Sequence, residues 1–166
     1  MLLSLAIFGA VLMYNNSKES IQEETKSAET QERLFEYRRP ENGAVFAKGN
    51  QSSTAPLKII SPAGADCYYV LKPTSSNKTA VRFYGRAGET VSISVPTGKY
   101  ELYYASGKTW YGRINLFGSD TVYRKCDEVL SFTENSGCTI SLNVTKNGNL
   151  GYKDVEESEF PKETKK

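Results

Sequence analysis

Short runs of β-favouring residues constrain the fold of this chain more than any other feature of its sequence. From Leu57 onward Val, Thr, Tyr and Phe dominate these runs, and turn residues separate them about every 8–12 positions. Such runs are typical of antiparallel sandwiches or barrels. The pattern therefore predicts an all-β domain over residues 56–155, an antiparallel β-sandwich of about 7–9 strands. The chain has 166 residues, which leaves room for one such domain and flanking segments.

The stretch 98–112, GKYELYYASGKTWYG, contains five aromatic residues, including the only tryptophan. Side chains alternate between the faces of a strand, so three residues of the first half belong to the inner face: Tyr100, Leu102 and Tyr104. We expect a second strand over residues 109–116, with Trp110 facing inward. A three-residue turn at 106–108 agrees with this alternation, whereas a two-residue turn would send Trp110 outside. The sequence thus predicts that Trp110 is a core residue.

The outer face of this predicted hairpin carries the candidate binding residues. Two tyrosines in cross-strand contact stand beside one acidic and one basic side chain: Tyr103, Tyr111, Glu101 and Arg113. Aromatic and charged cross-strand neighbours of this kind could form a shallow recognition patch. The alternative interpretation is that they are ordinary solvent-facing residues of a sheet.

A second hairpin is predicted over residues 121–144, with its turn near Asn135 and Ser136. Its inner side chains would be Leu130, Phe132, Ile140 and Leu142. In this hairpin Cys138 lies close to the turn, while Cys126 lies several residues further down the other strand. At about 3.3 Å per residue the two sulfur atoms are beyond disulfide reach.

The chain has three cysteines, Cys67, Cys126 and Cys138, and none of them forms a CxxC motif. An odd number without that spacing favours free thiols over a zinc site or a redox pair. One disulfide that involves Cys67, with one thiol left free, is the alternative in an oxidising compartment.

Histidine is absent from the sequence, which excludes Ser-His-Asp triads, Cys-His pairs and histidine-ligated zinc. The sequence also contains no glycine-rich phosphate loop and no EF-hand loop. We therefore expect no metal site and no cofactor. The net charge of +2 is too small to predict a nucleic-acid partner, and no basic patch interleaved with aromatic residues is visible.

The remaining catalytic candidates are carboxylates near predicted strand ends and one thiol: Asp120, Asp127, Glu128, Glu134 and Cys126. Nothing in their spacing fixes two carboxylates at a working separation. Asp127 would raise the pKa of the adjacent Cys126 thiol, which disfavours a nucleophile. An enzyme that depends on a carboxylate or a thiol is therefore the least favoured interpretation, and no catalytic residue is predicted.

Residues 1–14 are almost wholly apolar, although a spanning helix needs about 20 such residues. We favour a membrane anchor or signal-like segment over residues 1–16: a short anchor, an unusual signal peptide or the end of a longer membrane helix. A buried helix of a soluble domain is the alternative. Residues 17–55 are polar and rich in good helix formers, which predicts a stalk or linker, and residues 156–166 predict a charged, frayed tail.

The runs VSISVPTGKYELYYASGKTWYG and LFGSDTVY resemble a β domain that recurs in uncharacterised, membrane-tethered bacterial proteins. The resemblance covers roughly residues 56–152. More loosely, VSISVPTGKYELYYA is similar to the strand–turn–strand of prealbumin-like and carboxypeptidase-regulatory-like sandwiches. These resemblances imply a sandwich fold and tethering to a membrane, and they imply neither catalytic residues nor a ligand.

These observations together predict a membrane-anchored, non-enzymatic binding module of the cell envelope, with its β domain outside the cytoplasm. Its partner would be a protein or an envelope glycan. The alternative is a structural or accessory subunit of an envelope complex that has no ligand of its own.

Overall fold

The computed structural model describes residues 38–49, 53–75, 79–134, 136–142 and 151–163. The chain divides into two compact units, Met1–Glu36 and Tyr37–Lys166, and every described residue belongs to the second unit. The predicted anchor, residues 1–16, and most of the predicted stalk lie outside the described residues. Within the described part of the chain, no helix is long and apolar enough to cross a membrane.

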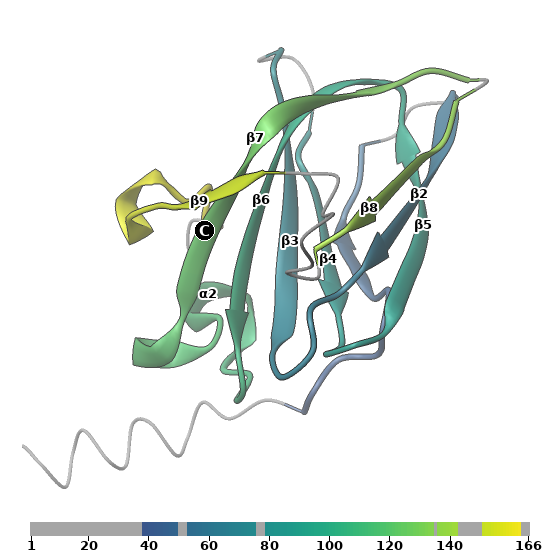
Figure 1. Ribbon diagram of the computed structural model, residues 1–166. Coiled ribbons are helices and arrows are strands. Elements are labelled where there is room, and N and C mark those ends of the chain that lie inside the picture. Colours follow the sequence, from purple (N-terminus) through teal and green to yellow (C-terminus); the bar gives the residue numbers. More distant parts are fainter. Residues whose placement is uncertain (1–37, 50–52, 76–78, 135, 143–150, 164–166) are drawn as a thin grey trace, which may run out of the picture. The chain divides into compact units, whose positions relative to one another are not determined.

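The described residues are mostly strand and form two sheets (Figure 1). The larger sheet has the order β1-β4-β3-β6-β7-β9, and the smaller sheet has the order β5-β2-β8. All strand pairs are antiparallel except β2 with β8. The strands are β1 (Val45–Ala47), β2 (Thr54–Ile60), β3 (Asp66–Pro73), β4 (Val81–Gly85), β5 (Thr90–Pro96), β6 (Gly98–Gly107), β7 (Val122–Phe132), β8 (Cys138–Ser141) and β9 (Tyr152–Asp154). The prediction of a mostly β domain with predominantly antiparallel sheets is confirmed.

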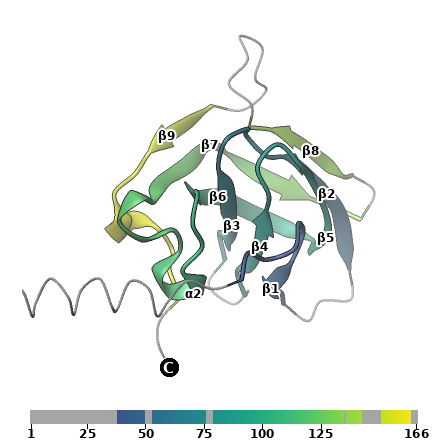
Figure 2. The same ribbon diagram turned by 90° about the horizontal axis from the view of Figure 1, so that it is seen from below.

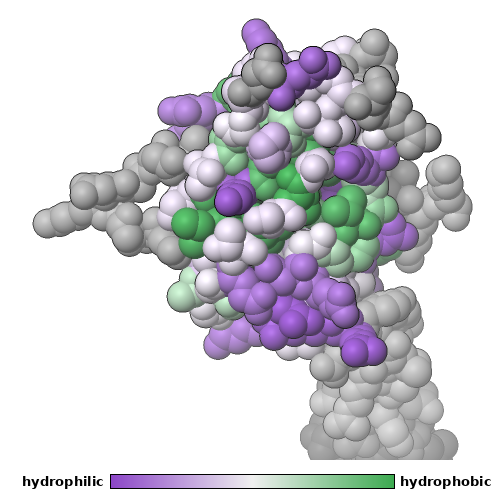
Figure 3. All heavy atoms as spheres, turned by 90° about the vertical axis from the view of Figure 1, so that its right-hand side faces the viewer, coloured by the Kyte–Doolittle hydropathy of each residue, from purple (hydrophilic) through white to green (hydrophobic). Residues whose placement is uncertain are grey.

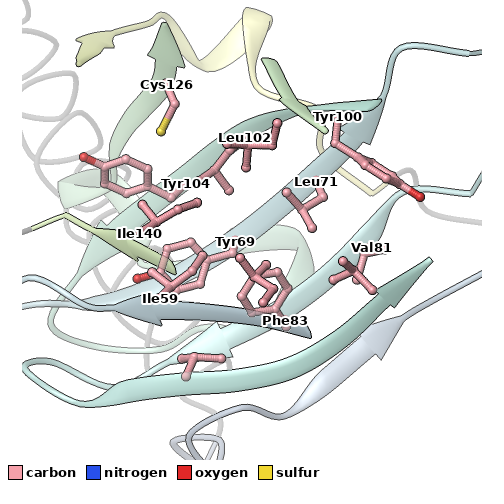
Figure 4. Close-up of a cluster of buried hydrophobic side chains, with 14 of the residues drawn as sticks. Ile59, Tyr69, Leu71, Val81, Phe83, Tyr100, Leu102, Tyr104, Cys126 and Ile140 are labelled. Carbon is pink, nitrogen blue, oxygen red and sulfur yellow. The ribbon is translucent and has the colours of Figure 1, made fainter. Parts of the chain in front are cut away.

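An inner core fills the space between the two sheets (Figures 2 and 4). Strand β2 shows how the sequence builds it, because exposed and buried residues alternate along the strand and Leu57 and Ile59 point inward. The inner residues predicted for β6 are all buried in this core: Tyr100, Leu102 and Tyr104. The two sheets therefore pack face to face, in a sandwich-like arrangement, over side chains that strand alternation selects.

An outer cluster covers part of the opposite face of the larger sheet. Its buried residues are Tyr68, Val70, Tyr84, Tyr103, Ala105, Trp110, Leu116, Phe117 and Phe160. Strand β3, at the centre of the sheet, is consequently buried on both faces from Asp66 to Leu71. Among the described residues, no comparable cluster covers the outer face of the smaller sheet, and its exposed side chains include Lys58, Ser92 and Ser94. Figure 3 faces this side of the molecule.

The predicted strand over residues 109–116 is wrong. After β6 the chain makes one helical turn, α2 (Gly112–Asn115), and a 3-10 turn, η1 (Gly118–Asp120), and β7 then becomes the partner of β6. Gly112 and Leu116 both have positive φ angles, +88° and +51°, which strand geometry does not allow. Trp110 is buried as predicted, with 5% of its surface exposed, but it belongs to the outer cluster.

The predicted hairpin over residues 121–144 is also wrong in its pairing. Strands β7 and β8 belong to different sheets, and β8 runs parallel to β2. Only an isolated bridge between Thr133 and Ser136 joins the two arms among the described residues. The four predicted inner residues do share the inner core: Leu130, Phe132, Ile140 and Leu142. Alternation thus identified the buried face correctly, but it carries no information about which strand is the neighbour.

The compact unit extends beyond residues 56–155 at both ends. Strand β1 lies within the predicted linker and pairs with β4. Arg39 forms two hydrogen bonds of 2.6 Å with the buried carboxylate of Asp66 at the start of β3. At the other end Phe160, in the predicted tail, is only 4% exposed. These contacts fasten both flanking segments to the larger sheet.

Candidate interaction surface

The structure separates the four residues of the predicted patch into two groups. Tyr103 and Glu101 share the outer face of β6, but Tyr103 is only 5% exposed because the outer cluster covers it. Tyr103 is opposite Val70 and Lys125, not opposite Tyr111. Tyr111 precedes α2 and is half-buried.

Arg113 is exposed on α2, and its Nη1 atom lies 3.2 Å from a carboxylate oxygen of Glu163. The guanidinium group also lies over the ring of Phe46, 5.9 Å from its centroid. The structure therefore brings Glu101 and Tyr103 together and places Arg113 beside the C-terminal end of the described chain.

A group of lysines occupies the half of this outer face that the outer cluster leaves uncovered. We call this group, with the one glutamate among its members, the lysine surface: Lys72, Lys99, Lys125, Lys153 and Glu101. Lys72 is directly opposite Glu101, and Lys125 is directly opposite Lys153. Lys99 lies two positions before Glu101 on the same strand. Residues that oppose each other across antiparallel strands point to the same face, so four neighbouring strands contribute to one surface.

Glu101 and Tyr103 organise the centre of the lysine surface. The Lys125 ammonium group donates a hydrogen bond of 2.6 Å to Glu101, and Lys72 lies 3.9 Å from the same carboxylate. The hydrogen bond from Lys125 lowers the pKa of Glu101, so the carboxylate is ionised at neutral pH. The ammonium groups of Lys125 and Lys72 also lie 5.3 and 5.9 Å from the centroid of the Tyr103 ring. Val129, opposite Glu101, adds an apolar side chain that is 53% exposed.

A bulge in β7 borders the lysine surface. Glu101 is opposite Val129, and the next pair is Tyr103 with Lys125, so Leu102 alone faces a stretch of three residues, 126–128. Cys126 points into the inner core, where burial, together with the two carboxylates that follow it, raises the pKa of the thiol to about 12. Those carboxylates, Asp127 and Glu128, are exposed.

The three cysteines are free thiols, and Cys67 and Cys126 are both buried in the inner core. Burial raises the pKa of Cys67 to about 12, so both buried thiols are protonated at neutral pH. Asp120, which precedes β7 in the sequence, and Glu134, which follows it, are both exposed. Within the described part of the chain, no three His, Cys, Asp or Glu side chains gather in a way that could hold a metal ion.

The C-terminal segment, residues 155–163, crosses the covered half of the same face. It contains the 3-10 turn η2 (Glu157–Glu159), and its Phe160 ring packs 5.1 Å from the ring of Tyr123 and 6.3 Å from that of Tyr103, centroid to centroid. The side chain of Glu163 accepts a hydrogen bond of 2.9 Å from the hydroxyl of Tyr68. An acidic segment with one aromatic residue is thus already bound on this face of the sheet.

The lysine surface was not predicted from the sequence. Its lysines come from four separate strands, and no two of them lie within 20 positions of each other along the chain. A signal was present, because Lys72 and Lys99 each flank a buried residue of a strand and must therefore point outward. The pairing order β3-β6-β7-β9, which gathers them, cannot be read from alternation alone.

Comparison of the chain with protein-family models, with curated proteins and with solved structures finds no match. The resemblance to membrane-tethered bacterial β domains therefore remains an expectation that rests on the residues alone.

Proposed function

We propose that the chain is a non-enzymatic interaction module, tethered to a membrane by its N-terminal segment, whose β domain binds an acidic segment of a protein partner. The single observation that carries the proposal is the lysine surface, in which four strands place four lysines and one glutamate on the outer face of the larger sheet. Clustered charges of one sign attract a partner of the opposite sign and raise its association rate.

The surroundings of the lysine surface favour a polypeptide partner over a glycan. The neighbouring half of the face already holds the chain's own acidic C-terminal segment through arginine, tyrosine and ring contacts. The exposed Val129 adds an apolar contact at the centre of the lysine surface. A mixed surface of this kind suits a protein segment, in which acidic and apolar side chains alternate.

The absence of an enzymatic role is part of the proposal. The raised pKa of Cys126 keeps its thiol protonated, which supports a structural role in the core. Neither a metal nor a cofactor is required for binding through lysines.

Binding of a fluorescein-labelled decaglutamate peptide to the full chain in detergent, followed by fluorescence anisotropy, tests the lysine surface. The triple variant Lys72→Ala/Lys99→Ala/Lys153→Ala removes three exposed lysines of the surface and leaves the pair of Lys125 with Glu101 intact. We expect its affinity to fall about tenfold or more relative to the unchanged protein.

The matched control removes three exposed lysines elsewhere, as Lys48→Ala/Lys58→Ala/Lys108→Ala. We expect this control to change the affinity less than about twofold, since it leaves the lysine surface intact. Equal losses in the two triple variants would mean that only net charge matters, and the proposal would be wrong. Tighter binding of polygalacturonate than of the peptide would identify an anionic glycan as the partner instead.

Tethering is tested separately with reporters fused to the C-terminus, one active only in the cytoplasm and one only outside it. We expect activity of the outside reporter in the membrane fraction. A soluble fusion, or activity of the cytoplasmic reporter, would contradict the proposed location without affecting the lysine surface.

A further inference from the structure

The C-terminal segment lies on the larger sheet without joining it as a strand. None of its residues from Val155 to Glu163 takes part in a strand ladder, and its regular structure is the single turn η2. Its backbone is fastened by a hydrogen bond of 3.0 Å from the Val155 N–H to the carbonyl of Tyr123, and by one of 2.7 Å from Arg82 to the carbonyl of Pro161. The strands beneath keep their own partners, since β6 pairs with both β3 and β7.

The first anchor of the segment is aromatic. The Phe160 side chain is 4% exposed and meets the ring of Tyr103 edge-on, at an interplanar angle of 89°, while it tilts against Tyr123 at 51°. Edge-to-face ring pairs of this kind are specific for an aromatic side chain, because they depend on the geometry of the ring as well as on its burial.

The second anchor is a carboxylate three residues later. Glu163 is surrounded by three donors: the Tyr68 hydroxyl at 2.9 Å, Arg113 Nη1 at 3.2 Å and Arg82 Nε at 3.9 Å. The Arg82 side chain is only 13% exposed and also donates a hydrogen bond to the carbonyl of Pro161. It therefore contacts both the carboxylate and the backbone of the segment. Hydrogen bonds that join charged groups are stronger than neutral ones and confer specificity for an acid.

We propose that the surface beneath residues 160–163 is a recognition site for protein segments in which an aromatic residue is followed three positions later by a carboxylate. We call it the anchor site, and its side chains are Tyr68, Arg82, Tyr103, Arg113 and Tyr123. The chain's own C-terminal segment is its resident occupant, and a partner segment of the same chemistry displaces it. The contacts of this site do not involve the four lysines or Glu101, but the site adjoins the lysine surface through Tyr103, whose ring meets both Phe160 and the ammonium groups of Lys72 and Lys125.

The test uses the full chain in detergent and a fluorescein-labelled peptide of sequence VEESEFPKE, which corresponds to residues 155–163. The variant Phe160→Ala/Glu163→Ala removes both anchors of the resident segment and leaves the side chains of the anchor site intact. A tethered occupant acts at an effective concentration of about a millimolar, so the unchanged chain resists the peptide. We expect the double variant to bind the peptide at least about tenfold more tightly than the unchanged chain does.

Two controls separate binding at the anchor site from general effects of charge and of mutation. Ser158→Ala changes an exposed residue of the same segment, so its peptide binding should equal that of the unchanged chain. A peptide in which the phenylalanine is replaced by alanine keeps every charge, and the double variant should bind it about tenfold more weakly. Equal binding of the two peptides would show attraction to the lysines alone and would overturn the proposal, as would no binding by a double variant that still unfolds cooperatively.

If the double variant does not fold, amide hydrogen exchange of the unchanged chain tests the proposal instead. We expect the amide of Val155, on the segment, to exchange at least about 100-fold faster than that of Leu102 in β6, because the segment opens while the sheet stays intact. Equal exchange rates would mean that the segment leaves only when the domain unfolds, and the proposal would be overturned.

Discussion

The inner core and the outer cluster of this domain are built from different parts of the chain. The inner core consists of side chains from strands of both sheets, with Leu142 following directly after β8. The outer cluster combines the outward side chains of three strands with residues that follow the strands, such as Trp110, Phe117 and Phe160. A sheet face becomes a core wherever another part of the chain covers it, and on the outer face that cover is irregular.

The two clusters also differ in chemistry. Aromatic residues are a minority of the inner core but the majority of the outer cluster, where Trp110 touches four other rings: Phe46, Tyr68, Tyr84 and Phe117. Both clusters contain tyrosines, but two tyrosines of the outer cluster direct their hydroxyl groups to carboxylates at its edge. Tyr68 binds Glu163 and Tyr84 binds Asp66 in this way. We next compare how much each cluster contributes to the free energy of unfolding and to the protection of the buried thiols.

We expect the largest effect from Phe83→Ala in the inner core. Phe83 is fully buried and stacks on Tyr69, at 5.0 Å between ring centroids. The truncation leaves a cavity between the sheets and should lower the free energy of unfolding by about 4 kcal/mol. Urea unfolding followed by circular dichroism measures this loss. A cost below about 1 kcal/mol would mean that the two sheets are not held together by this core.

Trp110→Ala should cost less, about 3 kcal/mol, because the irregular cover can collapse into the space that the ring leaves. Labelling of Cys67 and Cys126 by a thiol reagent sharpens the comparison, since both thiols are buried in the inner core. We expect labelling to stay slow in Trp110→Ala and to become fast in Phe83→Ala. Fast labelling in both variants would show that the two clusters open as one unit.

Asp66→Asn should cost about 2 kcal/mol at pH 7, because it weakens bonds that join a buried carboxylate to Arg39 and Tyr84. Burial alone would raise the pKa of Asp66, but the hydrogen bonds from Arg39, Tyr84 and the Ala87 amide hold it below its ordinary value. The carboxylate therefore stabilises the fold above its unfolded pKa of about 3.9 and loses this contribution as the pH falls through the lower folded value.

Urea unfolding of both proteins between pH 7 and pH 2 measures this dependence. We expect the stability difference between the unchanged chain and Asp66→Asn to shrink below about pH 4. The control Asp120→Asn alters an exposed carboxylate and should leave the pH profile unchanged. A constant difference down to pH 2 would mean that the charge of Asp66 contributes nothing.

The smallest effect is expected at an exposed position on the outer face of the smaller sheet. Ser94→Val changes an exposed residue of β5 and should alter the free energy of unfolding by less than about 0.5 kcal/mol. A stabilisation well above that figure would indicate that this face packs against something in solution, and the contrast between the two outer faces would disappear.

The inner core could be predicted from the sequence, because its residues follow the two-residue period of a strand. Tyr100, Leu102 and Tyr104 were predicted in this way. The outer cluster could not be predicted, because it depends on where β6 ends and on the turn that follows. The closeness of Phe117 to Gly107 illustrates this: a Cβ atom on Gly107 would lie 2.3 Å from the Phe117 Cβ, so only glycine fits there.

The candidate site was less predictable than the core. Glu101 was placed correctly on the outer face, yet the neighbours of Tyr103 were wrong because its strand partner is β7. Surface residues at separate strands become one site only through the order of the strands, which period-2 alternation does not encode.

The parallel pair of β2 with β8 has a consequence for how the domain is made. Leu57 pairs with Cys138, so β2, the central strand of the smaller sheet, pairs with a strand that is synthesised about 80 residues later. At about 5–20 residues per second a ribosome needs several seconds to deliver it. During that time one edge of β2 stays unpaired, with Leu57 and Ile59 on an incompletely covered face. Until β8 has been synthesised, this edge of β2 is therefore open to pairing with another chain.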